Sequence, residues 1–178
     1  MLPISHYPGA AHQNCVSAHR LAFTPSGTLF PSMPTYAVTT ATQQRRALFL
    51  RTANSELLLS ILFRYREQGR YLLHGFAIMP EHLHVLLTPG TNRTIERCVQ
   101  CIKGGFSFQV RRQFSGEVWQ AGFHEHRIRD EQDFQNQLAY IAANPDRRYL
   151  VDHRFVHTCY LDQNDPMPMR VEGQHLGG

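Results

Sequence analysis

The residues with the clearest chemical potential are His82 and His84, which stand two apart in the apolar segment MPEHLHVLL, from Met79 to Leu87. Side chains alternate between the faces of a β-strand, so a strand here would point both imidazoles the same way. Two neutral imidazoles form half of a divalent-cation site, which needs one more protein ligand plus water or substrate oxygens. The alternative is a buried strand whose histidines satisfy their own hydrogen bonds, and the spacing alone leaves both readings open.

A second group of chemically useful residues lies in the segment DFQNQLAYIAANP, which ends at Pro145. Its apolar positions predict a helix with a core-facing stripe. A different face carries four polar or amphipathic side chains at spacings of three and four: Asp133, Gln137, Tyr140 and Asn144. Pro145 stops a helix at or near Asn144, which puts Tyr140 in the last turn. A phenol there could act as a nucleophile, or it could be a half-buried tyrosine with its hydroxyl in water.

The elements that must position these residues follow from periodicity and turn signals. We expect strands over 35–42, 71–79, the histidine segment and 117–128. We also expect a helix capped by Asn54 and closed by Gly69, another from about Arg93, and a third from Asp130. The turn at Pro80 and Glu81 is so short that it requires antiparallel neighbours. The order predicts an α+β, ferredoxin-like (RRM-like) βαββαβ sandwich with an additional C-terminal helix that carries Tyr140.

Composition limits the number of domains and indicates the cellular compartment. The 178 residues, 42% of them hydrophobic, fit one domain, which we place at 35–160 between an irregular arm at 1–34 and a flexible tail at 161–178. The four cysteines show no paired framework, and we see no signal peptide or membrane span, which favours a cytoplasmic protein with no membrane partner. The net charge of +4 makes the surface mildly attractive to polyanions.

Basic and aromatic side chains give candidates for contact with nucleic acid. Guanidinium groups suit phosphate contacts, and Lys103 is the only lysine, although the base composition of the coding genome explains this equally well. The candidates that we select for DNA contact are Lys103, Arg111, Arg112, Trp119, Arg127 and Arg129. A solvated helix face and a core anchor remain the alternatives for the helix residues and for Trp119. His124 and His126 repeat the alternating spacing, and for them we favour DNA contact or plain surface over metal binding.

These segments together resemble a known family. MPEHLHVLLTP, IKGGFSFQVRR, VWQAGFHEHRIRD and LAYIAANP, in this order and at these intervals, are similar to the single-tyrosine HUH (IS200-like) transposases, specifically the REP-associated tyrosine transposase branch. The resemblance runs from about Thr35 to Val151. The joint pattern of histidine pair, basic helix and Tyr-x-x-x-Asn-Pro ending is far more specific than any one piece.

The resemblance implies an activity and a set of roles. The protein would be a DNA nickase and strand transferase that cleaves and rejoins single-stranded DNA near hairpin repeats through a covalent 5′-phosphotyrosine. Tyr140 would be the nucleophile, and His82, His84 and Asn144 would hold Mg²⁺ or Mn²⁺. The family resemblance also implies a bacterial, nucleoid-associated protein, and we lean towards a monomer, with a dimer as the alternative.

Two other functions stay open on the residues alone. A non-catalytic nucleic-acid-binding module could use the same ferredoxin-like sheet, although the aromatic signature of RNA-recognition domains is absent. A metal-dependent hydrolase of small phosphoesters is a further possibility, but it would leave Tyr140 and the arginines without a role.

Overall fold

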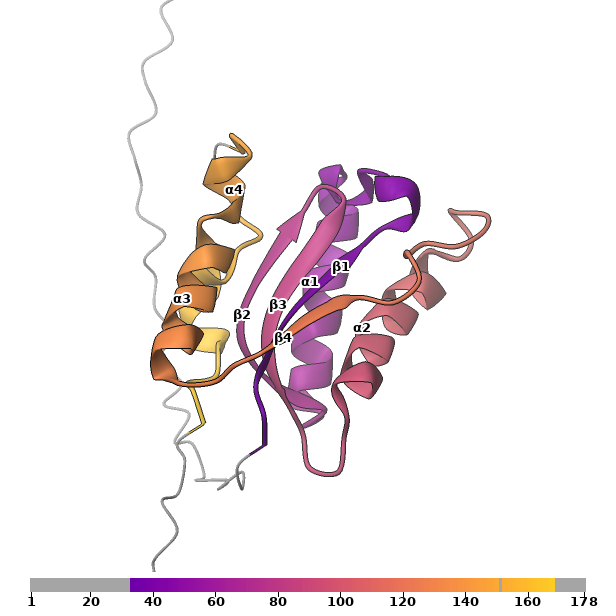
Figure 1. The fold of residues 1–178 in the computed structure, drawn as a ribbon. Coiled ribbons are helices and arrows are strands. Elements are labelled where there is room, and N and C mark those ends of the chain that lie inside the picture. The colour runs from indigo at the N-terminus through magenta and orange to yellow at the C-terminus, as the bar shows by residue number, and fades with distance from the viewer. Residues whose placement is uncertain (1–32, 151, 169–178) are drawn as a thin grey trace, which may run out of the picture.

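The computed structural model describes residues 33–150 and 152–168 (Figure 1). The helices and strands follow in this order: β1 (Tyr36–Ala41), α1 (Thr52–Glu67), β2 (Tyr71–Met79), β3 (His82–Pro89), α2 (Ile95–Val110), β4 (His124–Arg127), α3 (Glu131–Ala142) and α4 (Asn144–Arg147). The described residues also form three 3₁₀ segments: η1 (Gln43–Arg45), η2 (Leu48–Leu50) and η3 (His157–Gln163). Within the described residues, no helix is long and apolar enough to cross a membrane. The arm expected at 1–34 lies almost wholly outside the described residues.

The four strands form one antiparallel sheet in the order β2-β3-β1-β4. With α1 and α2 as the crossovers, this is the predicted ferredoxin-like βαββαβ arrangement, and the fold class is confirmed. Figure 1 shows α1 and α2 on one side of the sheet and α3 with α4 on the other. The extra C-terminal helix therefore covers the face that a bare ferredoxin-like unit leaves open.

The β2–β3 hairpin supplies one edge strand and one central strand of the sheet, and it is buried along nearly its whole length. Met79 pairs with His82, so Pro80 and Glu81 alone make the turn, as the sequence predicts. Alternation along β3 sends Leu83, Val85 and Leu87 into the core beneath α1 and α2. Leu86 packs on the other face, in the cluster that includes Phe134 and Ile141 of α3. His82 and His84 share that second face.

Two predicted boundaries are wrong in detail. Asn54 does not cap α1, because the helix begins at Thr52 and the Asn54 side chain instead donates to the Leu48 carbonyl oxygen at 2.7 Å. The strand expected over 117–128 is β4 alone, His124–Arg127. The preceding residues form a loop that touches the sheet through one bridge between Thr42 and Trp119.

The folded part also continues past the boundary expected at residue 160. The Asp165 carboxylate accepts two hydrogen bonds from Arg66, at 2.8 and 2.6 Å, and one from the Leu73 amide at 2.8 Å. Asp165 thus links this segment to α1 and β2. The last ten residues lie outside the described part of the chain.

Candidate active site

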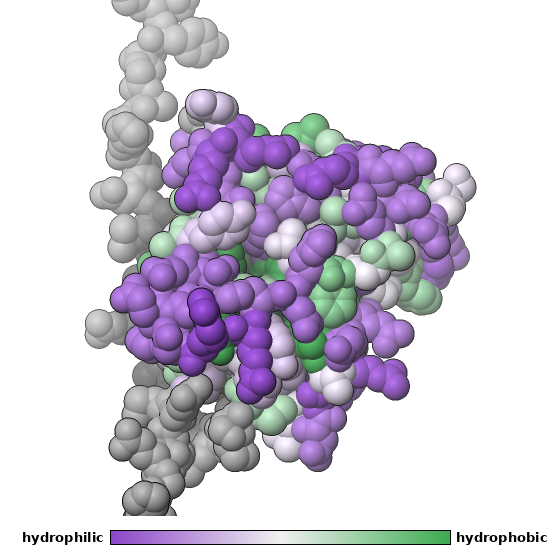
Figure 2. Space-filling view, in the orientation of Figure 1, coloured by the Kyte–Doolittle hydropathy of each residue, from purple (hydrophilic) through white to green (hydrophobic). Residues whose placement is uncertain are grey.

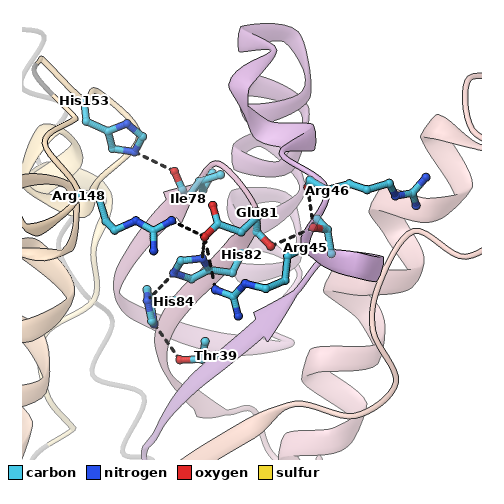
Figure 3. A network of polar contacts seen from close by, with 10 residues as sticks. Thr39, Arg45, Arg46, Ile78, Glu81, His82, His84, Arg148 and His153 are labelled. Carbon is cyan, nitrogen blue, oxygen red and sulfur yellow. Dashed lines mark hydrogen bonds and ion pairs between the residues drawn. The ribbon is translucent and has the colours of Figure 1, made fainter.

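The two histidines of β3 face each other on the α3 side of the sheet. Their Nε2 atoms are 2.9 Å apart, and the imidazole planes are nearly perpendicular. Behind them, His84 Nδ1 is hydrogen-bonded to Thr39 Oγ1 on β1 at 2.8 Å, and His82 Nδ1 lies 3.4 Å from Glu81 Oε1 (Figure 3). Hydroxyl and carboxylate partners at Nδ1 favour the tautomer whose Nε2 carries a lone pair.

Both imidazoles are held neutral. Burial lowers the pKa of His84 to about 4, helped by neighbouring His82 and opposed by a smaller contact with the Asn144 side chain. Burial also lowers the pKa of His82, because the attraction of Glu81 only partly offsets it. Neutral imidazoles are the form that binds metal, so at ordinary pH the pair is in the protonation state that a metal ligand requires.

Tyr140 and Asn144 approach this pair from the C-terminal helices. The Tyr140 ring meets the His84 ring edge-on, with centroids 5.8 Å apart, and the tyrosine is 42% exposed. Asn144 is buried, and its amide donates to the Tyr140 carbonyl oxygen at 2.8 Å. Pro145 does not end the helical path outright, because it falls in the first turn of α4, where its missing N–H costs nothing.

One pocket of about 480 Å³ unites these groups. Its lining includes all four residues to which the sequence assigned chemistry: His82, His84, Tyr140 and Asn144. Among the described residues there is no cluster of three or more His, Cys, Asp and Glu suited to a metal. The side chains that the pocket offers as candidate ligands are two imidazoles and the Asn144 amide. Two Nε2 lone pairs aimed at each other fit a shared cation.

The helix that carries Tyr140 is fixed at its start by capping and by a link to β4. Asp130 caps α3 by accepting from the Asp133 amide at 2.8 Å. The Asp133 carboxylate in turn contacts His126 Nε2 at 2.9 Å and accepts from the Arg129 amide at 3.0 Å. Burial alone would raise the pKa of Asp133, but these hydrogen bonds outweigh it and lower that pKa. The predicted polar face of α3 thus overlies the sheet, and His126 joins β4 to this helix.

The basic and aromatic candidates are dispersed. Lys103 Nζ donates to the carbonyl oxygens of Gln120 and Gly122, at 2.7 and 2.8 Å, and so holds the loop that borders the pocket. Trp119 is buried, and its indole N–H donates to the Lys103 carbonyl oxygen at 3.1 Å. It is a core anchor, and its position does not support the base-stacking role. Arg111, Arg112, Arg127 and Arg129 are exposed, but the pocket lining includes none of them.

Two arginines of the pocket were not predicted from the sequence, whereas His124 was considered there, with DNA contact or plain surface favoured. Arg45 and Arg148 line the pocket, as does His124, which stands opposite Thr39 in the β1–β4 register. Thr39 itself stands opposite His84 in the β1–β3 register. The alternation of His124 was a usable signal, whereas nothing local marks either arginine. Figure 2 shows a mainly hydrophilic surface on this side of the molecule, with apolar areas in smaller patches.

Comparison with known proteins identifies the family. Residues 32–144 match the family model described as "Transposase IS200 like". The chain belongs to the IS200-like transposase family. The matched segment contains His82, His84 and Tyr140 and ends at Asn144.

Individual relatives place this IS200-like transposase near the branch predicted from the sequence. It is 25% identical over 112 residues to a REP-associated tyrosine transposase of Escherichia coli (strain K12), covering 62% of this chain and 66% of that protein. It is 26% identical over 142 residues to an uncharacterised protein of Haemophilus influenzae, covering 62% and 79% respectively. A solved REP-associated tyrosine transposase bound to a REP hairpin has the same fold, with a TM-score of 0.63, 22% identity and coverage of 79% and 87%. The predicted resemblance is confirmed.

Proposed function

We propose that this IS200-like transposase cleaves and rejoins single-stranded DNA through a covalent bond between Tyr140 and a 5′ phosphate. The observation that carries the proposal is the shared pocket, in which a half-exposed phenol meets a neutral histidine pair. Residues from β3, α3 and α4 converge there, although they are separated by up to 62 positions in the sequence. A binding module would not need such a convergence.

In the cleavage step, the Tyr140 phenolic oxygen forms a bond to phosphorus and gives up its proton. The bond between phosphorus and the 3′ oxygen breaks, and the leaving strand takes up a proton as a free 3′ hydroxyl. The phosphodiester energy is kept in the phosphotyrosine. A second 3′ hydroxyl can therefore reverse the step and join a new strand without a nucleotide cofactor.

His82, His84 and the Asn144 amide oxygen would hold the Mg²⁺ or Mn²⁺ that we expect. Such an ion polarises the scissile phosphate and draws charge onto its oxygens. Thr39 and Glu81 keep each imidazole turned so that Nε2 faces the pocket. The Asn144 side chain also donates to the Tyr140 carbonyl oxygen, and this hydrogen bond fixes the position of the proposed third ligand relative to the nucleophile.

The DNA partner that we propose is a single strand beside a hairpin repeat. This rests on the family and on the solved relative, whose structure contains a REP hairpin. One chain supplies Tyr140, both histidines and Asn144 to the same pocket. We therefore propose that a monomer is sufficient for cleavage.

The test is a denaturing gel of the protein with end-labelled single-stranded hairpin DNA, taken from the repeats that flank the gene, in Mg²⁺ or Mn²⁺. We expect a protein-linked band that requires metal and disappears in Tyr140→Phe. Tyr149→Phe is the matched control, because Tyr149 is 91% exposed and does not line the pocket. Cleavage that survives Tyr140→Phe would show metal-activated water as the nucleophile. Binding without cleavage would show a recognition module.

A further inference from the structure

Two arginines from distant segments converge at the entrance of the pocket. Arg45 lies in η1, just after β1, and Arg148 follows α4 directly. Both reach the same carboxylate oxygen, Glu81 Oε1, with nitrogen–oxygen distances of 3.4 and 2.7 Å. Figure 3 shows the two guanidinium groups approaching Glu81 from opposite sides, beside His82.

The charges around this carboxylate do not balance. Glu81 is 7% exposed and is not part of the pocket lining, whereas the side chains of Arg45 and Arg148 are 59% and 52% exposed and line the pocket. Among the described residues that form the lining, there is no carboxylate. One Glu81 charge offsets one guanidinium, so a surplus positive charge faces the open space. An anion is the ligand that such an entrance favours.

The backbone at Arg45 has an unusual conformation, which nearby hydrogen bonds hold in place. Gln44 and Arg45 both have positive φ angles, 54° and 51°, although neither is glycine. Successive left-handed residues persist only where surrounding contacts hold them. Here the Gln43 amide donates to the Val118 carbonyl oxygen at 2.8 Å, and Thr42 Oγ1 donates to the Arg46 carbonyl oxygen at 2.7 Å. This turn carries the Arg45 side chain to the pocket.

We propose that Arg45 and Arg148 form a phosphate clamp, which grips a backbone phosphate of the single strand as it enters beside His82 and Tyr140. The guanidinium fork matches phosphate oxygens, and each arginine keeps donors free while one of its nitrogens contacts Glu81. Glu81 holds the two groups at a fixed separation, so little side-chain freedom is lost when DNA binds. The clamp rests on the proposed function, because it requires a single-stranded nucleic acid in this pocket.

The test measures binding without cleavage. Affinity for a fluorescent single-stranded hairpin oligonucleotide is measured in EDTA, over a series of salt concentrations, for the unaltered protein, Arg45→Gln and Arg148→Gln. We expect each variant to bind about tenfold more weakly, and the slope of log K against log salt to fall by about 0.7 for each lost phosphate contact. A purely structural role would leave that slope unchanged.

Arg154→Gln is the matched control. Arg154 is 59% exposed and ion-paired with Glu56, but it does not line the pocket, so the variant makes the same charge change away from the site. Arg45→Lys and Arg148→Lys keep the charge without the fork, and we expect intermediate affinity from them even if a glutamine variant fails to fold. If the pocket variants match Arg154→Gln while the unaltered protein binds, the clamp is wrong and the proposed function stands. If the unaltered protein binds no single strand, both are wrong.

Discussion

Two histidine groups lie at opposite ends of the β2–β3 hairpin, and both face α3. At one end, His74 is almost completely buried, its ring packs edge-on against Phe134, and both ring nitrogens have partners. Nδ1 is 2.9 Å from the Asp165 carbonyl oxygen, and Nε2 is 2.8 Å from Thr88 Oγ1. Thr88 is in turn 2.7 Å from Thr35 Oγ1, so the chain of hydrogen bonds is complete.

At the other end, the hydrogen bonding of His82 and His84 is incomplete. Their Nε2 atoms lie against each other, and His82 Nδ1 has no hydrogen bond in the described structure, only the longer contact with Glu81. The first group is closed to solvent, whereas the second lines a pocket. A buried histidine whose two nitrogens are both taken by the protein is a structural element. A pair that lines a pocket, as His82 and His84 do, fits the proposed role of binding a ligand from outside the chain.

The largest effect that this comparison predicts is loss of cleavage in His84→Ala. Removing one of the two imidazoles takes away several kcal/mol of transition-state stabilisation, which corresponds to a rate at least about 10²-fold lower. The pocket is open, so water can take the place of the ring, and we expect the free energy of unfolding to change by less than about 1 kcal/mol. Single-turnover cleavage and guanidinium unfolding measure the two quantities. Cleavage within tenfold of the unaltered protein would remove His84 from the site.

The converse change, His74→Ala, should act on stability alone. It leaves the Asp165 carbonyl and the Thr88 hydroxyl short of a partner and opens a cavity beside Phe134, which together should cost about 2–4 kcal/mol of unfolding free energy. Cleavage by the folded fraction at low temperature should match the unaltered protein. A loss of cleavage at unchanged stability would mean that the two histidine groups are not separate in role.

The sequence predicted the parts of this comparison that depend on local pattern. Gly69 and Pro80 bracket β2, so its limits were predicted correctly, and alternation placed both His82 and His84 on one face. Helical spacing placed Tyr140 and Asn144 together, and tertiary contacts then brought them to the histidines.

Contacts that depend on distant segments were not predictable in this way. Arg45 and Arg148 meet at Glu81 only because η1 and the end of α4 are brought to the same hairpin turn. Trp119 was assigned to a strand, but it lies in an irregular loop that turns its indole into the core. Asp165 lies in a polar, proline-rich segment typical of a tail, and its anchoring role appears only when Arg66 and Leu73 are next to it.

The smallest predicted effect is the pH dependence of stability that His74 causes. Burial lowers the pKa of His74, whose hydrogen bond with the Asp165 carbonyl offsets this only in part. An unfolded histidine binds a proton near pH ~6.5, so above that value neither state is protonated and the contribution of His74 to stability is complete. As the pH falls below ~6.5 towards the lower folded-state pKa, only the unfolded chain gains a proton, and stability falls by up to about 1.4 kcal/mol per unit.

His157 is affected in the same direction by burial, which lowers its pKa as well, so part of the acid sensitivity remains when His74 is removed. Unfolding free energies of the unaltered protein and of His74→Ala, measured from pH 7.5 to 5.0 in EDTA, should therefore converge as the pH falls. The difference between them should shrink between pH 6.5 and 5.5, by at most about 1 kcal/mol. If the two proteins lost stability in parallel as the pH falls, His74 would take up its proton equally in the folded and unfolded states. The closed hydrogen-bond chain would then not hold His74 neutral.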